Sequence, residues 1–256
     1  MPFKAGFQGV ILATSLVVIS ACGLMPDFGS DGMSRTEKAS LNLQMGVRYM
    51  DLGMLDVAKE KLQTAYDLDS RNPEILNALA VFYERIKDNE KAEDFYESAL
   101  GKDPENYSIK NNFGRFWCDR GNQEKGIALL QESLQSAMNN RHWLAESNIG
   151  LCLLQQNNRL QAEEYFRKAL QSNPEYAPAL KEMLKLSYDN QQYMSARAFL
   201  ERYLAVAKHT PDTLWYAFQT ERAMGHYQAA DEYQEQLLNT FPTSKEAQDI
   251  KTAISK

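Results

Sequence analysis

The sequence is poor in the residues that most catalytic and metal sites need. It has three histidines and three cysteines in 256 residues, with no Cys-x-x-Cys spacing. We expect His142, His209 and His226 to lie in or beside turns between helices, and none has a partner at metal-ligand spacing. A glycine-rich phosphate loop and a nucleophile motif are also missing. The sequence therefore predicts no catalytic residue, no metal site and no cofactor, and it argues against an enzyme.

The chain also lacks an excess of positive charge. It has 28 Lys and Arg against 34 Asp and Glu, which gives a net charge of -6. Proteins that bind nucleic acid carry a basic footprint, so we expect no nucleic-acid partner. Eight prolines and 13 glycines are too few for a long disordered region, and alternating strand patterns are missing. An all-α fold is the remaining class.

An apolar run from Val10 to Ser20 is too short for a membrane span of about 20 residues. It follows Lys4, as in an export signal, which we assign to residues 1–21. Ile19-Ser20-Ala21-Cys22 resembles the lipobox of bacterial lipoproteins, in which the cysteine is acylated and becomes the mature amino terminus. This resemblance implies a covalent lipid on Cys22. An ordinary secretory signal that happens to contain a cysteine is the alternative.

The residues after Cys22 indicate where the lipid would sit. In such lipoproteins Asp after the cysteine retains the protein in the inner membrane, so Gly23 implies the outer membrane, with the rest of the chain in the periplasm. Residues 22–36 are rich in Gly, Pro, Ser and Asp and show no helical period. We interpret them as a flexible tether. The folded domain is then predicted to span residues 37–256.

A repeat of about 34 residues fills that domain. Its twentieth place is small in all six units: Ala58, Ala92, Gly126, Ala162, Ala196 and Ala230. Small residues at fixed places predict pairs of antiparallel helices whose backbones approach closely, and prolines such as Pro174 end the second helix. The period and pattern resemble the tetratricopeptide repeat. We predict an α-solenoid of six such repeats over residues 39–242, followed by an amphipathic capping helix at 244–255.

A more specific resemblance lies in the third and fourth repeats. The segment from Asn111 to Cys118, NNFGRFWC, looks like the Asn-Asn-aromatic-Gly-x-Phe-x-Cys signature of lipoproteins of type IV pilus biogenesis. These are the pilotins, which deliver the outer-membrane secretin. Residues Asn148 to Cys152 are similar to the segment that follows in that family, whereas Trp117 departs from its usual leucine. The resemblance implies an adaptor that binds secretin subunits and promotes their localisation and multimerisation.

Cys118 and Cys152 are candidates for a disulfide. Both fall on the first helix of adjacent repeats, with an axial offset of about 3 Å at 1.5 Å per residue. An oxidising periplasm favours the bond if the Cα atoms lie within about 7 Å. Two small buried thiols are the alternative.

The first helices of a solenoid also line a groove, and three apolar residues are predicted to lie there in the first repeat. Leu43, Val47 and Met50 are at groove places and are not needed, on this reading, for packing between helices. Leu151 and Leu154 occupy such places in the fourth repeat. The pattern predicts a site for an amphipathic helix or an extended segment of a partner. A tether or capping residue that covers this face is the alternative.

The function that combines these features is that of a non-enzymatic adaptor, expected to act as a monomer. Its predicted partner, from the resemblance, is the outer-membrane secretin of the type IV pilus. A second possibility keeps the architecture and changes the client, to peptidoglycan enzymes or the machinery of outer-membrane barrel assembly.

Overall fold

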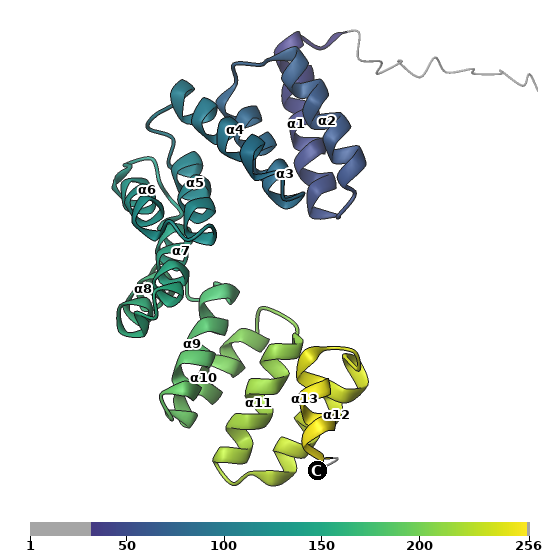
Figure 1. The fold of residues 1–256 in the computed structure, drawn as a ribbon, viewed down its shortest axis with the longest axis vertical. Coiled ribbons are helices and arrows are strands. Elements are labelled where there is room, and N and C mark those ends of the chain that lie inside the picture. The colour runs from purple at the N-terminus through teal and green to yellow at the C-terminus, as the bar shows by residue number, and fades with distance from the viewer. Residues whose placement is uncertain (1–31, 255–256) are drawn as a thin grey trace, which may run out of the picture. The chain divides into compact units, whose positions relative to one another are not determined.

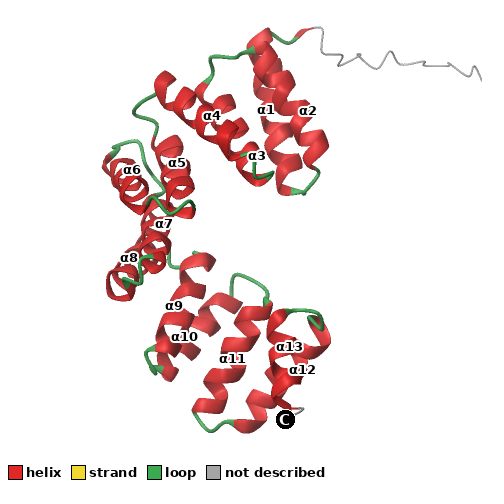
Figure 2. Ribbon diagram, in the orientation of Figure 1, coloured by secondary structure: helices red, strands yellow, loops and turns green. Residues whose placement is uncertain are grey.

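The computed structural model describes residues 32–254, so the predicted signal, Cys22 and most of the tether lie outside the described residues. The described part is all helical and has no strand (Figures 1 and 2). Residues Arg35–Lys256 form one compact unit. Its helices are α1 (Arg35–Asp51), α2 (Leu55–Leu68), α3 (Pro73–Arg85), α4 (Asn89–Lys102), α5 (Tyr107–Asp119), α6 (Gln123–Gln135), α7 (His142–Gln155), α8 (Arg159–Ser172), α9 (Ala177–Asp189), α10 (Tyr193–Leu204), α11 (Pro211–Ala223), α12 (Tyr227–Thr240) and α13 (Lys245–Ile254).

The helices pack as six consecutive pairs, from α1 with α2 to α11 with α12, and each pair contacts the next. This arrangement confirms the predicted α-solenoid. The last helix, α13, packs against α11 and α12, where Ala247 and Ile250 are buried with Leu214, Phe218 and Leu237. It therefore covers the apolar face that the sixth repeat would otherwise expose.

The turn inside each repeat has the same backbone geometry. One residue per turn has a positive φ, and the six are Gly53, Lys87, Gly121, Asn157, Gln191 and Gly225. These six residues are spaced like the sequence repeats. In each repeat, the turn between the two helices therefore contains one residue in the left-handed conformation. Side-chain caps then start several second helices. The side chains of Asp88 and Asn122, for example, accept a hydrogen bond from the backbone N–H three residues later, at Lys91 and Lys125.

One predicted boundary is wrong. The interval from Gly126 to Ala162 is 36 residues, two longer than the others, and the sequence alone predicts a second helix that reaches about Met138. Helix α6 instead ends at Gln135, because Ser136 adopts an extended conformation. Asn139 is buried beyond this point. Its side chain donates to the Ser133 carbonyl at 2.9 Å and accepts from the Arg141 backbone at 2.8 Å. The two extra residues of this interval therefore form an ordered loop rather than a longer helix.

In the third repeat the two helices cross with their backbones in contact. A Cβ atom added to Gly126 would lie 2.5 Å from Cys118 Sγ and 2.7 Å from the Gly114 carbonyl oxygen. The same place in the other repeats is alanine, exposed by at most 1%. Backbone contact at this crossing explains why only small residues occupy it.

No helix among the described residues has the length and apolar character that crossing a bilayer would require.

We predict that Gly126→Ala lowers the free energy of unfolding by about 1–3 kcal/mol, because the methyl group meets backbone and sulfur atoms that cannot move away. Urea denaturation followed by circular dichroism measures this. Gly101→Ala is the matched control, since Gly101 lies in helix α4 with no atom within 4 Å of the added carbon. Equal stability of the Gly126 variant and wild type would contradict the close crossing.

Candidate functional site

The first helices of the first four repeats make a continuous surface. Helices α1, α3, α5 and α7 contact one another in succession. We call the surface that they share the first-helix face. It carries both of the features described below, an apolar hollow and a row of amides.

The apolar hollow lies between α1 and α3 and has a volume of about 330 Å³. Its apolar lining consists of Leu43, Val47, Met50, Ala78 and Val81. Polar side chains surround this lining, namely Asp51, Glu74, Asn77, Arg85 and Asn112. The structure therefore brings together the three groove residues that the sequence placed in the first repeat.

The second repeat contributes apolar lining that we did not name from the sequence. Val81 stands 34 residues after Val47, at the same place of its repeat, and it lines the hollow beside Ala78. A comparison of the residues at the position of Val47 in each repeat would have identified Val81.

One expectation about the hollow is wrong. Met50 is only 4% exposed and belongs to the core between the first two repeats, and Leu43 packs partly against that core. Both side chains are therefore needed for packing between helices as well as lining the hollow. Val47, which is 38% exposed, is the most open of the three.

The two groove residues predicted in the fourth repeat do not join the hollow. Leu151 is exposed, and Leu154 packs half-buried against the core of the third to fifth repeats. Leu154 therefore contributes to packing between repeats. The hollow is confined to α1 and α3, with one contribution from Asn112 of α5.

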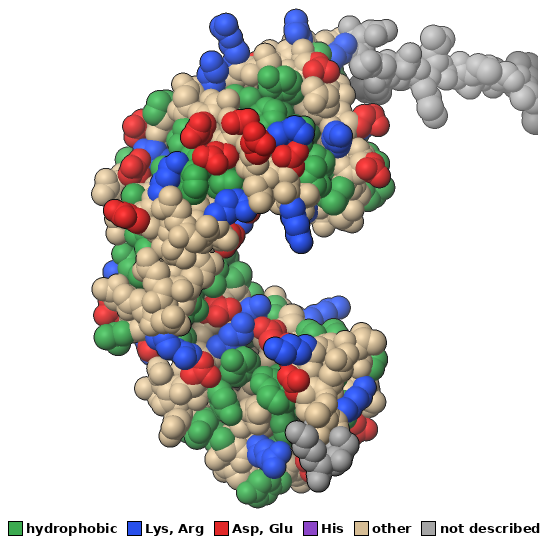
Figure 3. Space-filling view, in the orientation of Figure 1, with side chains coloured by type: hydrophobic (Ala, Val, Ile, Leu, Met, Phe, Trp, Pro, Cys, Tyr) green, Lys and Arg blue, Asp and Glu red, His purple; other side chains and the backbone are tan. Residues whose placement is uncertain are grey.

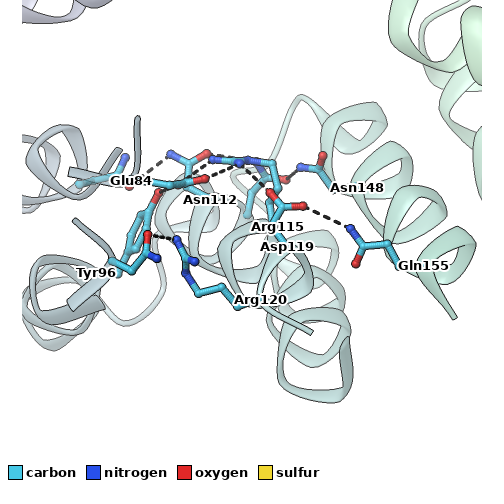
Figure 4. A network of polar contacts seen from close by, with 11 residues as sticks. Glu84, Tyr96, Asn112, Arg115, Asp119, Arg120, Asn148 and Gln155 are labelled. Carbon is cyan, nitrogen blue, oxygen red and sulfur yellow. Dashed lines mark hydrogen bonds and ion pairs between the residues drawn. The ribbon is translucent and has the colours of Figure 1, made fainter. Parts of the chain in front are cut away.

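Beside the hollow, side-chain amides form a row across three repeats (Figure 4). Asn148 Nδ2 donates to Asn111 Oδ1 at 3.0 Å, and Asn111 Nδ2 donates to Asn112 Oδ1 at 3.4 Å. Asn112 Nδ2 in turn donates to Asn77 Oδ1 at 3.2 Å. The two asparagines of the NNFG segment are therefore the centre of an inter-repeat row, and Asn77 and Asn112 also border the hollow.

An ion-pair cluster fixes α3, α4 and α5 beside the row. Arg115 donates to the two oxygens of Glu84 at 2.6 and 2.9 Å, and to Asp119 at 3.1 Å (Figure 4). Burial opposes the charge on Arg115, but the Glu84 carboxylate outweighs it and raises the arginine pKa. Burial and, after it, Glu84 raise the pKa of Tyr96, whose hydroxyl donates to Glu84 at 3.0 Å. The tyrosine therefore stays protonated as a donor.

The signature cysteines meet across adjacent repeats. Cys118 of α5 and Cys152 of α7 form a disulfide, with Cα atoms 5.3 Å apart and both side chains buried. Phe113 and Phe116 of the same signature are buried in the core beside Tyr96, and Gly114 lies against Gly126 and Leu130. Most of the signature therefore serves the junction between the third repeat and its neighbours.

The histidines do not meet one another. Within residues 32–254, no three His, Cys, Asp or Glu side chains gather as a metal cluster would require. His226 Nδ1 lies 2.8 Å from the buried Glu221 carboxylate, and burial lowers the pKa of His209. On the face shown in Figure 3, acidic and basic side chains are interspersed with apolar ones.

Comparison with known proteins defines the class of this one. Tetratricopeptide-repeat models match residues 43–107 and 153–221, together just over half of the sequence. The chain belongs to the tetratricopeptide-repeat family.

Two relatives narrow the class. The type IV pilus assembly protein PilF of Pseudomonas aeruginosa is 27% identical over 216 residues, which cover 84% of this chain and 86% of PilF. A solved structure of PilF from the same species aligns with a TM-score of 0.74 and 26% identity, over 86% of this chain and 99% of that one. PilW, described as a widely conserved type IV pilus biogenesis factor, aligns with a TM-score of 0.72 and 28% identity, over 83% and 97%. The predicted resemblance to repeat proteins of type IV pilus biogenesis is confirmed.

We predict that reduction of the Cys118–Cys152 bond lowers the free energy of unfolding by about 4 kcal/mol, since the bond closes a loop of 34 residues in the unfolded chain. Urea denaturation with and without reductant gives the difference. A double Cys118→Ala, Cys152→Ala variant should be insensitive to reductant. Equal stability of the oxidised and reduced wild type would show that the bond does not constrain the unfolded chain.

Proposed function

We propose that this protein is a lipid-anchored adaptor of type IV pilus biogenesis that binds secretin subunits in the periplasm and holds them at the outer membrane. The observation that carries the proposal is the apolar hollow on the first-helix face. Similarity to PilF and PilW over more than four fifths of the chain supports the pathway. The lipobox-like segment ending at Cys22 supports the anchor.

The hollow suits a short amphipathic segment of a partner. Its volume of about 330 Å³ is enough for two or three large apolar side chains, and Leu43, Val47 and Val81 supply an apolar lining. Glu74 and Arg85 stand 11 residues apart on α3, so they lie about 16 Å apart along the helix axis. A segment with an apolar centre and opposite charges at its ends would match these two residues.

Anchoring would make this contact effective. A lipid on Cys22 and a tether of about a dozen residues confine the repeat unit to a thin layer beside the bilayer. Partner subunits that bind in the hollow are then concentrated in the same layer, which favours their assembly without any chemical step. The protein thus acts by position rather than by catalysis.

The double variant Leu43→Glu, Val47→Glu should lose at least tenfold in retention of the secretin. Two carboxylates in the lining would be desolvated by any apolar segment that entered. Co-purification of the secretin from membranes measures the loss. Leu160→Glu is the matched control because Leu160 is 74% exposed and lies outside the hollow. Unchanged retention in the double variant would remove the first repeat from the binding site.

Cys22→Ser tests the anchor separately. We expect the variant to disappear from the outer-membrane fraction and secretin multimers to fall with it, because a protein without lipid is no longer held at that bilayer. Fractionation and immunoblotting of both proteins provide the measurement. Deletion of the protein with pili intact but altered cell wall or porin levels would instead favour the second client class, peptidoglycan enzymes or barrel assembly.

A further inference from the structure

One surface of the first helix is exposed in the first repeat, whereas the corresponding surface is buried in every later repeat. The first helix of each repeat has three places that correspond to Leu41, Met45 and Arg48 of α1. In the second to sixth repeats, the side chains at these places pack against the second helix of the preceding repeat. All fifteen side chains at these places are at most 3% exposed: Ile75, Leu79, Phe82, Ile109, Phe113, Phe116, Ala145, Ile149, Cys152, Ala179, Met183, Leu186, Thr213, Ala217 and Thr220. In α1, the first helix that the structure describes, the same places are less buried: Leu41 and Arg48 are exposed and Met45 is half-buried.

We call this surface the open stacking face and define it by Lys38, Leu41, Met45, Arg48 and Leu52. These residues recur at intervals of three and four, so they form one stripe along α1 and the turn that follows it. Leu41 is 44% and Leu52 56% exposed, Arg48 is exposed, and Lys38 and Met45 are half-buried. The stripe therefore combines two basic side chains with three apolar ones.

The charge on this face sets it apart from the other repeats. None of the fifteen buried side chains at the corresponding places is charged. Lys61 of α2 also stands at the place of Phe95, whose ring packs edge-on against Tyr66 of the preceding repeat at 6.0 Å. Three acidic residues lie close to the stripe in sequence: Glu37 at its edge, Asp51 three residues after Arg48, and Glu60, which pairs with Lys61 at 2.8 Å. The five residues of the stripe themselves include two basic and no acidic side chains, on a chain whose net charge is -6.

These features decide between possible occupants. A further repeat-like helix pair, from a partner or a second copy, would bury the Arg48 guanidinium where the other repeats bury uncharged groups, and an unpaired buried charge is strongly unfavourable. A lipid headgroup layer accepts the same pattern. Leucine and methionine enter the acyl boundary, while lysine and arginine extend to phosphate oxygens at their own level.

The order of the chain points to the same occupant. Cys22, the proposed site of lipid attachment, lies 13 residues before Arg35. Thirteen residues span at most about 45 Å. Of all the helices, α1 is therefore the one that the tether holds nearest to the bilayer along the chain. The attraction has to be local, because the protein as a whole is acidic.

We propose that the open stacking face docks on a bilayer surface that contains anionic phospholipid, so that α1 is both the end of the solenoid and its second contact with the membrane. This inference rests on the proposed membrane anchoring. It adds an orientation of the folded unit relative to the bilayer, in which α1 contacts the lipid and the hollow lies beside that contact.

The test uses residues 32–256, which lack Cys22 and therefore bind lipid only through the folded unit. All thirteen helices lie within this span and form one compact unit, and the solved PilF structure aligns with 86% of this chain over 99% of its own length. Co-sedimentation compares vesicles of phosphatidylcholine and phosphatidylglycerol, three to one, with pure phosphatidylcholine. We expect binding to the anionic vesicles only, and binding that weakens as salt is added.

Lys38→Glu with Arg48→Glu should reduce that partitioning at least about twentyfold, since each basic residue near an anionic surface is worth about fivefold. Lys102→Glu with Lys208→Glu changes the net charge equally at exposed positions of other repeats and should leave partitioning within about twofold of wild type. No binding to anionic vesicles, or an equal loss in both pairs, would overturn the proposal. A dimer in sedimentation that Leu41→Glu dissociates would also overturn it, by assigning the face to a second copy.

A second measurement uses the mature acylated chain. An environment-sensitive fluorophore on Leu41→Cys should shift to the blue on anionic vesicles, whereas the same label on Leu160→Cys should remain in water. A blue-shifted Leu41 label in the absence of vesicles would assign the face to the chain's own preceding segment and overturn the proposal. Secretin retention by the Lys38→Glu, Arg48→Glu variant of the acylated protein separates the two ideas: we expect it to be unchanged, so that loss of lipid docking leaves the hollow's function standing.

Discussion

Backbone contact between the two helices of a repeat is the constraint on which the structure depends. Where helices cross with only a hydrogen atom or a methyl group between them, no larger side chain fits, and Gly126 shows the extreme, with neighbouring atoms 2.5 and 2.7 Å from an added carbon. Each crossing fixes one helix pair, and the apolar face left over on that pair can be buried only by the next. The stack, its groove and its two unlike ends all follow from this packing.

The sequence predicts these crossings well because they are local and periodic. Ala58 to Ala230 keep their register through all six repeats, and the positive-φ residues of the turns, such as Gly53 and Gly225, keep the same intervals. Prediction fails where the period is broken. The interval after Gly126 is longer, and only the burial of Asn139 against Ser133 decides that the extra residues form a loop and not another turn of α6.

The candidate site was predictable in part, for a related reason. Periodicity finds the residues that face a groove, and Leu43 and Val47 do line the hollow, but periodicity cannot say how deep a side chain lies. Met50 lines the hollow and also belongs to the core, and Leu154 turned out to pack. Contacts between repeats, such as the amide row through Asn112, join residues about 35 apart whose pairing no single repeat reveals.

Periodicity is most informative at the ends of the solenoid. A repeat position that packs against a neighbouring repeat inside the stack has no such neighbour there, so its residue type indicates what replaces that neighbour. At the C-terminal end, α13 supplies the missing neighbour with Ala247 and Ile250. At the other end, α1 keeps leucine at one stacking place and puts arginine at another, where the five later repeats bury phenylalanine, cysteine, leucine or threonine. A face that combines exposed leucine with lysine and arginine is suited to an interface that is itself partly apolar and partly charged. The boundary between lipid headgroups and acyl chains has that composition.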